Sequence, residues 1–483
     1  MTHTLHNSNS NPEIASQLLG EKRLVDSELQ YAVSLSQSTI ALLPCCDLFE
    51  DFFDTINMSL DTFCKEQTGG WMFNYIESLE LVGIRTILVF FSARVSQPTR
   101  LTHLPTGAIV CVLPPSKPYL LFRAMLRQMK DWWKRPKKQT EGNTSSDASS
   151  KSSGLQTSRF PVLSALKSGV GSFGSYISTP LGLLAQELRQ QGCTAILCQD
   201  YEYARFDIVV LLGKIMHLPV FATFQGGDKI PSLFEYPFRW LALRASHGLI
   251  VAPQMERDRL QAEYGITPPK VVRIFNPMGV TTWQAMDRSE GRHYLNIPLG
   301  ARVAVFHGRM QMQQKGLDIL LNAWEKICQQ RPDKDLRLLL VGTGSDAEEL
   351  SRQIHAKKLR GIIWINEYVR DRAAIQRYLS AADVYVLPSR KEGFPVAPLE
   401  AMACSLPIVA SDVAGISDIL EHGRESGGII FPREDVDSLV LNLGQLLDNE
   451  YISREMGKQA RKRVEEGFTF EVIGKQIQAL LTS

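Results

Sequence analysis

Short runs of apolar residues recur along the chain, each bounded by glycine, proline or polar residues. In the first half they lie at 38–44, 85–91, 107–114, 193–199, 218–224 and 247–253. Apolar runs of about four to eight residues with such boundaries are typical of strands that are buried on both faces. Segments with helical spacing, such as 71–83 and 206–217, separate several of these runs. The alternation predicts a parallel sheet covered by helices.

The pattern becomes more regular after residue 300. Six β-rich runs lie at 302–309, 336–344, 361–365, 383–389, 406–412 and 427–431. Helical segments separate the first five of them, at 316–330, 347–358, 373–382 and 399–404. Alternation of this length predicts a doubly wound parallel sheet with right-handed crossovers. We therefore expect an α/β protein made of two Rossmann-like domains.

The domain boundaries follow from changes in composition. Residues 1–36 are polar and predict a flexible N-terminal tail, and 37–280 predict the first domain. Residues 281–483 predict the second domain, including a final helix. Residues 134–158 are rich in Ser, Thr and Lys and contain a single aliphatic residue, so they predict a disordered basic insertion.

An amphipathic segment at 119–138 comes immediately before this insertion. Its predicted apolar face contains Phe122, Met125, Met129 and Trp132, and its basic face contains Arg123, Arg127, Lys130 and Lys134. One interpretation is a helix that docks on an anionic membrane surface through its tryptophans and basic side chains. The other is a helix that packs on the domain and turns its basic face to solvent. The sequence leaves both open.

Composition indicates the cellular compartment and limits the classes of binding partner. Lys plus Arg number 53 and Asp plus Glu number 51, so no nucleic-acid partner is expected from bulk charge. The 8 cysteines lack the spacing of metal ligands and predict reduced, buried thiols. The N-terminus has no leader pattern, and no apolar run is long enough to span a bilayer. These features favour a cytoplasmic protein, either free or peripheral on the cytoplasmic face of a membrane.

Charged side chains follow the predicted strands of the second half. Arg309 comes directly after one strand, and Lys315 begins the next helix. Glu392 and Glu400 bracket a Gly-Phe-Pro-Val-Ala-Pro loop that follows another strand. Ligands bind at the carboxyl ends of the strands in such sheets, where two cations and a helix start favour a diphosphate without a metal. Carboxylates can accept hydrogen bonds from sugar hydroxyls, so the pattern indicates a nucleotide-sugar site.

These motifs resemble the family-four (group 1) retaining glycosyltransferases of GT-B fold. The resemblance covers the C-terminal half and implies that Arg309 and Lys315 bind the donor diphosphate. It implies that Glu392 binds the transferred sugar and Glu400 the nucleotide ribose. The remaining donor-binding residues that it implies in this half are Gly308, Tyr368, Val369, Phe394, Pro395, Val396 and Ala397.

The N-terminal half matches this family more loosely. Gly69 and Gly70, ahead of a predicted helix, are similar to the glycine loop near the donor phosphates, but they lie unusually far from the first strand. On the acceptor side, Gln225 stands where the family often has histidine, and an amide cannot carry a proton. Two further departures are Glu367, where glycine is common, and Asp418, where glutamate is usual.

The resemblance implies transfer of a hexose from a nucleoside diphosphate-sugar to a hydroxyl acceptor with retention of configuration. Charge builds on the leaving diphosphate, so its stabilisation by Arg309 and Lys315 is the main catalytic task, and we expect neither metal nor cofactor. A lipid-linked or polysaccharide-precursor acceptor is favoured. Two alternatives are a non-catalytic sugar-nucleotide-binding module and, from Gly342 and Gly344 in 341–350, a nicotinamide-dependent oxidoreductase.

Overall fold

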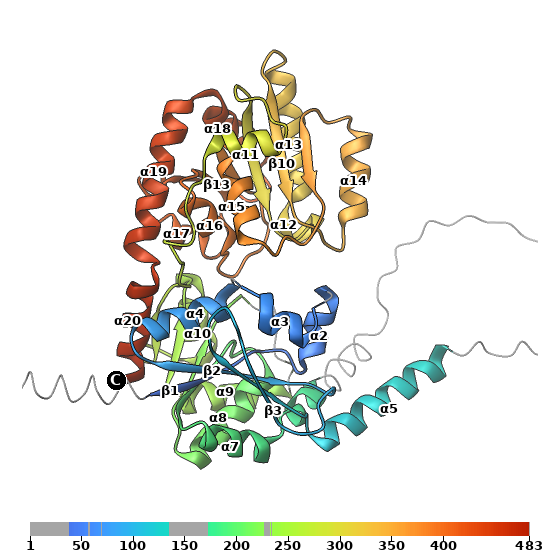
Figure 1. Ribbon diagram of the computed structural model, residues 1–483, viewed down its shortest axis with the longest axis vertical. Helices are drawn as coiled ribbons and strands as arrows, with labels where there is room; N and C mark the ends of the chain where they lie inside the picture. Colours follow the sequence, from blue (N-terminus) through green and yellow to red (C-terminus); the bar gives the residue numbers. More distant parts are fainter. Residues whose placement is uncertain are drawn as a thin grey trace, which may run out of the picture.

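The chain folds into two α/β domains that lie one above the other along the long axis of the molecule (Figure 1). The computed structural model describes residues 38–56, 58–68, 70–134, 172–226, 232 and 234–482, and the side chains of all of these except 129–134. The expected tail at 1–36 lies outside the described residues, as does nearly all of the expected insertion at 134–158.

The N-terminal domain is built on an eight-stranded sheet in the order β3-β4-β2-β1-β5-β6-β7-β8. Neighbouring strands pair in parallel except for β3 and β4, which are antiparallel. The strands are β1 (Thr39–Leu43), β2 (Arg85–Phe91), β3 (Thr99–Thr102), β4 (Ile109–Leu113), β5 (Cys193–Cys198), β6 (Val220–Thr223), β7 (Gly248–Val251) and β8 (Val271–Arg273).

Helices cover both faces of this sheet. They are α2 (Phe49–Phe53), η1 (Asp54–Ile56), α3 (Leu60–Glu66), α4 (Gly70–Leu81), α5 (Lys117–Lys134), α7 (Leu181–Gln190), α8 (Ala204–Met216), α9 (Glu235–Ala245) and α10 (Gln254–Tyr264). Alternate residues of β1 point to opposite faces, so Ala41 and Leu43 enter one core while Ile40 and Leu42 enter the other. Burial on both faces explains the continuous apolar runs in the sequence.

The C-terminal domain is built on a six-stranded, fully parallel sheet in the order β11-β10-β9-β12-β13-β14. Its strands are β9 (Arg302–His307), β10 (Leu336–Val341), β11 (Ile362–Ile365), β12 (Val384–Leu387), β13 (Ile408–Ser411) and β14 (Gly428–Phe431). The strand order reverses between β9 and β12. The crevice beyond the carboxyl ends of these two strands is the place where such sheets bind ligands.

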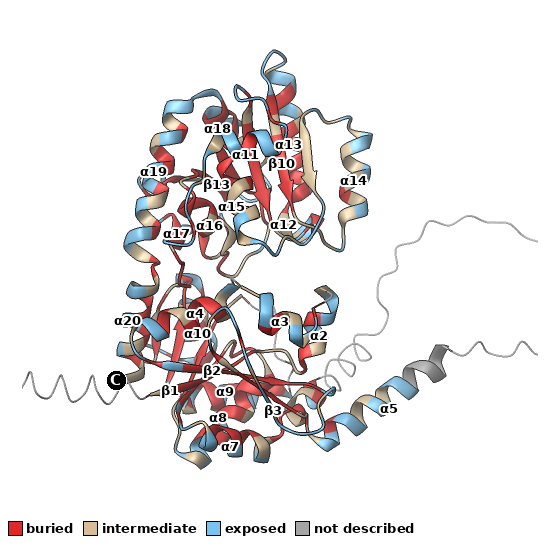
Figure 2. Cartoon of the chain, in the orientation of Figure 1, coloured by how far each residue is buried: buried red, intermediate tan, exposed pale blue. Residues whose placement is uncertain are grey.

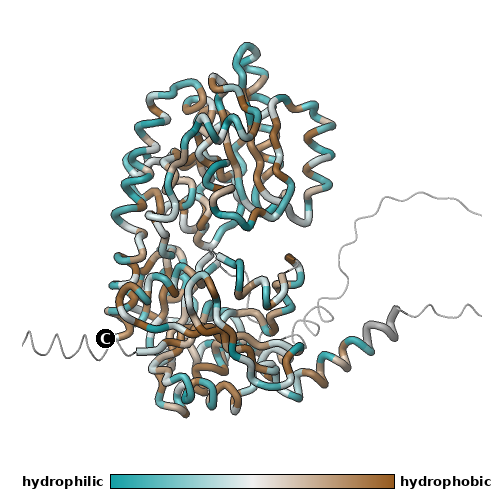
Figure 3. The backbone as a smooth tube through the Cα atoms, viewed as in Figure 1, coloured by the Kyte–Doolittle hydropathy of each residue, from teal (hydrophilic) through white to brown (hydrophobic). Residues whose placement is uncertain are grey.

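The helices of this domain surround its sheet. They are α11 (Arg288–Tyr294), α12 (Met312–Lys315), α13 (Leu317–Gln330), α14 (Ala347–Ala356), α15 (Arg372–Ser380), α16 (Ala397–Ala403), α17 (Ile416–Ile419), η2 (Gly423–Ser426), α18 (Val436–Asp448) and α19 (Glu450–Gly467). Buried residues follow the two sheets and the helix faces turned toward them (Figure 2), and the most hydrophobic stretches of backbone coincide with the strands (Figure 3).

The final helix corrects one sequence-based boundary. We assigned it to the C-terminal domain, but α20 (Phe470–Thr482) crosses back and packs on α4 of the N-terminal domain (Figure 1). Ile473 and Ile477 are fully buried in an N-terminal core. The apolar stripe of α20 packs against the same face of the first sheet as α2, α3 and α4. This helix therefore joins the two domains.

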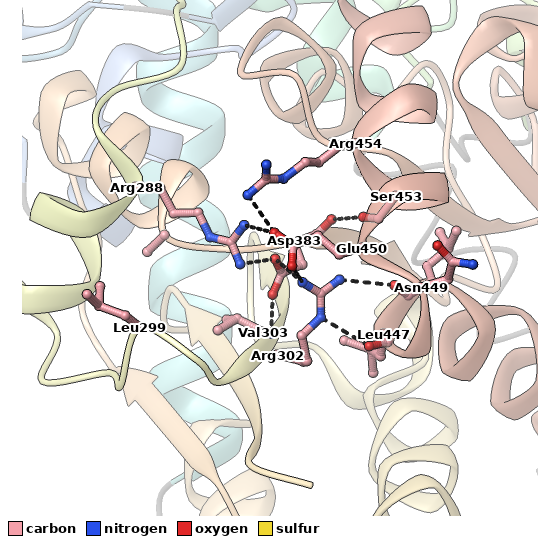
Figure 4. Close-up of polar contacts among 12 residues, drawn as sticks. Arg288, Leu299, Arg302, Val303, Asp383, Leu447, Asn449, Glu450, Ser453 and Arg454 are labelled. Carbon is pink, nitrogen blue, oxygen red and sulfur yellow. Dashed lines mark hydrogen bonds and ion pairs between the residues drawn. The ribbon is translucent and has the colours of Figure 1, made fainter.

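A buried ion cluster fixes the amino edge of the C-terminal sheet (Figure 4). Asp383, directly before β12, accepts hydrogen bonds from Arg288, from Arg292 Nη2 at 2.9 Å and from Arg302 Nη1 at 3.1 Å. It also accepts from the backbone N–H of Val303 at 2.7 Å. Because this edge is opposite the carboxyl ends of the strands, the cluster holds the fold and does not form part of the candidate site.

The amphipathic helix predicted near residue 119 is present as α5, which projects from the N-terminal domain (Figure 1). Phe122 packs edge-on against Phe173 at 6.0 Å, and Arg123 pairs with Asp51 at 2.9 Å. Leu121 and Met125 remain 73% and 49% exposed. In the described part of the chain, no helix is long and apolar enough to cross a membrane.

Candidate active site

The loop after β9 brings a basic residue to the end of β12. α12 ends at Lys315, and Gly316 follows it with a φ of +61°, a conformation that favours glycine. A Cβ at Gly316 would lie 2.0 Å from the carbonyl oxygen of Pro388. The absence of a side chain therefore lets α12 and α13 approach the end of β12 and places Lys315 over the loop that follows that strand.

Lys315 and Glu392 form the centre of the candidate site. Lys315 Nζ lies 2.7 Å from Glu392 Oε1 and 2.9 Å from Oε2, and the hydroxyl of Ser389 donates to Oε1 at 2.6 Å. The Lys315 and Glu392 side chains are only 14% and 8% exposed. Arg390 clamps the start of this loop through Asp318 at 2.7 and 2.8 Å. Two residues predicted to hold different parts of a donor are therefore paired with each other.

Glu400 lies in the first turn of α16 and is paired as well. Its Oε2 is 2.7 Å from His307 Nε2, at the end of β9. The hydroxyl of Tyr385 donates to the carbonyl of His307 at 3.3 Å. Burial raises the pKa of Tyr385, and the charges of Glu392 and Glu400 raise it further. These hydrogen bonds give His307 a structural role, so its presence at the end of β9 does not require it to act as a base.

The loop between the two glutamates touches the other domain. A Cβ at Gly393 would lie 2.1 Å from the Cα of Gly226, which follows β6 in the N-terminal domain. Phe394 is buried and stacks on Phe275 of the interdomain linker, with ring centroids 5.5 Å apart. The Phe394 side chain therefore anchors the loop, while Pro395, Val396 and Ala397 lead into α16.

The other predicted residues are distributed around this centre. Arg309 follows Gly308 after β9, and its side chain is exposed. Tyr368 is 48% exposed, whereas Val369 packs on the C-terminal core. Gly70 begins α4 with a φ of +78°, and Gly69 lies outside the described residues.

Gln225 makes a reciprocal amide pair with Asn276, in the segment that follows β8. Its Nε2 donates to Asn276 Oδ1 at 3.1 Å, and Asn276 Nδ2 donates back to Gln225 Oε1 at 3.0 Å. Asn276 belongs to the linker between the domains and is 3% exposed. Gln225, at the position where the family often has histidine, is therefore held by hydrogen bonds to Asn276.

Asp200 and Asn276, near the domain boundary, were not predicted from the sequence, and neither were the partners of Asp418. Asp418 accepts from Arg273 of β8 at 2.7 Å and from the backbone N–H of Gln254 at 3.2 Å, so it ties the domains together. Burial raises the pKa of Asp200 to about 7, although backbone N–H groups of Glu202 and Gln225 oppose this shift. The signal that could have found Asp200 is its position two residues after β5, because residues at the carboxyl ends of the strands lie near the crevice where such sheets bind ligands.

Residues 301–449 match the family model described as Glycosyl transferases group 1. The chain is 30% identical over 260 residues to a D-inositol 3-phosphate glycosyltransferase of Kineococcus radiotolerans. It is 28% identical over 265 residues to an alpha-maltose-1-phosphate synthase of Mycolicibacterium smegmatis. These matches cover 49% and 52% of this chain but only 59% and 66% of the two relatives.

Solved structures share the whole two-domain arrangement. A sucrose-phosphate synthase from Thermosynechococcus elongatus has a TM-score of 0.60 at 16% identity, over 92% of this chain and 98% of that one. Anabaena HepE in complex with UDP has a TM-score of 0.63 at 16% identity, over 92% and 99% of the two chains. At this level of identity the likeness establishes the fold. The chain therefore has the GT-B fold, and its residues 301–449 are similar to the group 1 glycosyltransferases.

Proposed function

We propose that the protein transfers a hexose from a nucleoside diphosphate-sugar to a hydroxyl acceptor with retention of anomeric configuration. The observation that carries this proposal is the meeting of Lys315, Ser389 and Glu392 at the switch point of the C-terminal sheet. Arg309 provides a second, exposed cation after the same strand that leads to Lys315. Solved HepE complexes contain UDP and UDP-glucose, which supports uridine diphosphate-sugars as the first donors to test.

The chemical task is to stabilise charge on the departing diphosphate. An ammonium group has three donors, so Lys315 can keep Glu392 as a partner and still donate to a phosphate oxygen. Glu392 Oε2 accepts only from Lys315 among the described residues and retains lone pairs for a sugar hydroxyl. Because Glu392 neutralises part of the Lys315 charge, Arg309 supplies additional positive charge to the diphosphate. The acceptor hydroxyl attacks on the front face and the leaving phosphate takes its proton, so no protein nucleophile or metal is required.

The acceptor side is proposed to face a membrane. α5 carries exposed Leu121 and Met125 as well as exposed Arg127, which favours an amphiphilic acceptor such as a lipid-linked saccharide. Gln225 is proposed to lie on the acceptor side of the crevice, where its pair with Asn276 positions the neighbouring Gly226.

Donor binding and turnover test this function. Uridine, guanosine and adenosine diphosphate-sugars are screened for a rise in Tm, and consumption of the stabilising donor is then measured. We expect Lys315→Ala to lower turnover at least about 100-fold, in line with removal of one charge-stabilising donor. Lys326→Ala is the matched control because Lys326 pairs with Asp437 on the surface. Near-normal turnover by a folded Lys315→Ala protein would refute the assigned role.

Two alternatives remain distinguishable. A donor that raises Tm but is never consumed, with or without acceptors, would favour the non-catalytic binding module. The oxidoreductase alternative rested on Gly342 and Gly344, but both glycines are needed for packing. A Cβ at Gly342 would lie 2.1 Å from the Gly308 oxygen, and one at Gly344 would lie 2.5 Å from the Met310 oxygen. Close packing of two loops accounts for both glycines, so tight NADH binding is not expected.

A further inference from the structure

An apolar cleft of about 540 Å³ opens in the N-terminal domain on the side that faces the C-terminal domain. Its walls come from the segment between β1 and α4, from the ends of β2 and β5, and from Tyr368 across the domain boundary. Most of its lining is aromatic or aliphatic: Pro44, Phe52, Phe53, Ile56, Phe63, Trp71, Met72, Phe73 and Phe90.

The unusually long segment before Gly70 builds this cleft. It folds into α2, η1 and α3, whose rings pack on β2. Phe53 stacks on Phe49 at 4.2 Å, and Phe63 meets Phe53 and Phe90 edge-on at 5.1 and 5.2 Å. Because these rings hold one another in place, the wall is formed before any ligand arrives.

Charge argues against a phosphorylated ligand in this cleft. Among the described lining residues, Asp51 alone is charged, and it is already paired with Arg123 at 2.9 Å. A phosphate entering here would find a carboxylate and no cation in the lining, and its desolvation would be costly. A hydrocarbon group would instead gain about 25 cal/mol for each Å² of surface removed from water.

The cleft adjoins the proposed donor site. Tyr368, predicted to lie against the nucleotide, and Gly70, predicted near its phosphates, both contribute to the lining. Arg370, two residues after Tyr368, donates to the carbonyl of Ile56 at 3.2 Å, so the C-terminal domain touches this wall directly. A group held in the cleft therefore lies beside the place where the donor is expected.

We propose that the cleft holds the hydrocarbon part of the acceptor, and that the substrate is an alkyl- or isoprenyl-type amphiphile with its hydroxyl directed toward the donor. This inference rests on the proposed function and adds to it the class of acceptor and the residues that select it. Phe52, at 50% exposure, forms the accessible edge of the cleft and is the residue best suited to a test.

Hexyl, octyl and decyl β-D-glucosides are titrated calorimetrically into the full chain, below their micelle concentrations, with glucose and glucose 6-phosphate as comparison ligands. Affinity is expected to rise about threefold per methylene, and both comparison ligands should bind far more weakly. Phe52→Glu should weaken octyl glucoside binding at least tenfold. Phe238→Glu is the matched control, because Phe238 has 45% exposure on α9 and does not line the cleft.

Three results would overturn the inference: affinity independent of chain length, an unchanged affinity in Phe52→Glu, or displacement of octyl glucoside by UDP. The last would assign the cleft to the nucleotide. The titration uses no donor, so a failure to bind any nucleotide-sugar would count against the proposed function and not against the cleft. With a donor that binds, octyl glucoside should alter donor turnover, whereas free glucose at the same concentration should not.

Discussion

Lys315 and Glu392 illustrate how one pair of residues can serve both the fold and the proposed reaction. Both side chains are largely buried, so removing one leaves the other charge without its partner. We expect Lys315→Met to lower the free energy of unfolding and Lys315→Met/Glu392→Gln to recover part of that loss, with a coupling of about 0.5–3 kcal/mol. Urea unfolding measures the coupling. Turnover should stay low in the double variant, and recovery of activity would contradict the catalytic assignment.

Asp200 predicts how stability depends on pH. Burial raises its pKa to about 7 from an ordinary 3.8, and burial together with the charge of Asp200 raises that of Glu202 to about 8. A carboxyl group with a raised pKa contributes stability at low pH, which is lost as pH rises through the folded value. Tm should therefore fall between pH 5 and 8, and Asp200→Asn should flatten this part of the profile. A variant profile that matches the wild type would contradict the shift.

Motifs in the sequence singled out Lys315, Glu392 and Glu400 but did not predict the pairs that these residues form. The pairs Lys315–Glu392 and His307–Glu400 join residues 77 and 93 positions apart, and no local pattern encodes such a contact. Asn276 was missed for the same reason, because its partner Gln225 lies 51 positions earlier in the chain.

At the scale of elements, strands that form apolar runs were predictable, whereas the two edge strands of the N-terminal sheet were not. All six strands of the C-terminal sheet were expected, since each is an apolar run between breakers. β3 has alternating exposure and lies at an antiparallel edge, and β8 has only three residues, so neither produces such a run. The helices α2 and α3 were missed because, with 5 and 7 residues, they are too short to show a helical period in the sequence.

Asp383 joins the starts of α11, β9 and β12 with α19, whose Ser453 donates to its backbone carbonyl at 2.6 Å. Asp383→Ala would leave Arg292, which is 1% exposed, as an unpaired buried charge. We expect a loss of about 3–5 kcal/mol in the free energy of unfolding, measured by urea denaturation. Glu450→Gln is the control, because this partner is half-exposed and should change stability by less than about 1 kcal/mol.

Substitution of the exposed apolar residues of α5 tests the proposed contact between this helix and a membrane. The full chain should bind vesicles containing phosphatidylserine, and Leu121→Glu/Met125→Glu should reduce the bound fraction in sedimentation assays. Both positions are exposed, so the fold should tolerate the change. Leu211→Glu on α8, at 55% exposure, is the matched control. Equal binding by both variants would leave α5 as a helix packed on the domain with a solvated basic face.

At the scale of the whole molecule, the two domains meet through contacts that permit little adjustment. Asp418 bonds to Arg273, and α20 links the C-terminal domain to the first sheet. Gly393 and Gly226 approach so closely across this interface that neither has room for a side chain. Catalysis between substrates held on different domains requires this closeness, because a displacement of about 1 Å at the reacting atoms can cost 100-fold in rate.

Gly393→Ala tests whether this approach sets the separation of the domains. The added Cβ would lie 2.1 Å from the Gly226 Cα, so the domains must move apart while each keeps its own core. We expect a larger radius of gyration by small-angle X-ray scattering, a nearly unchanged Tm and a loss of turnover of at least about tenfold. Gly300→Ala is the control, because a Cβ there meets nothing within 4 Å. Full activity in Gly393→Ala would mean that the domains close by a route in which these two glycines do not touch.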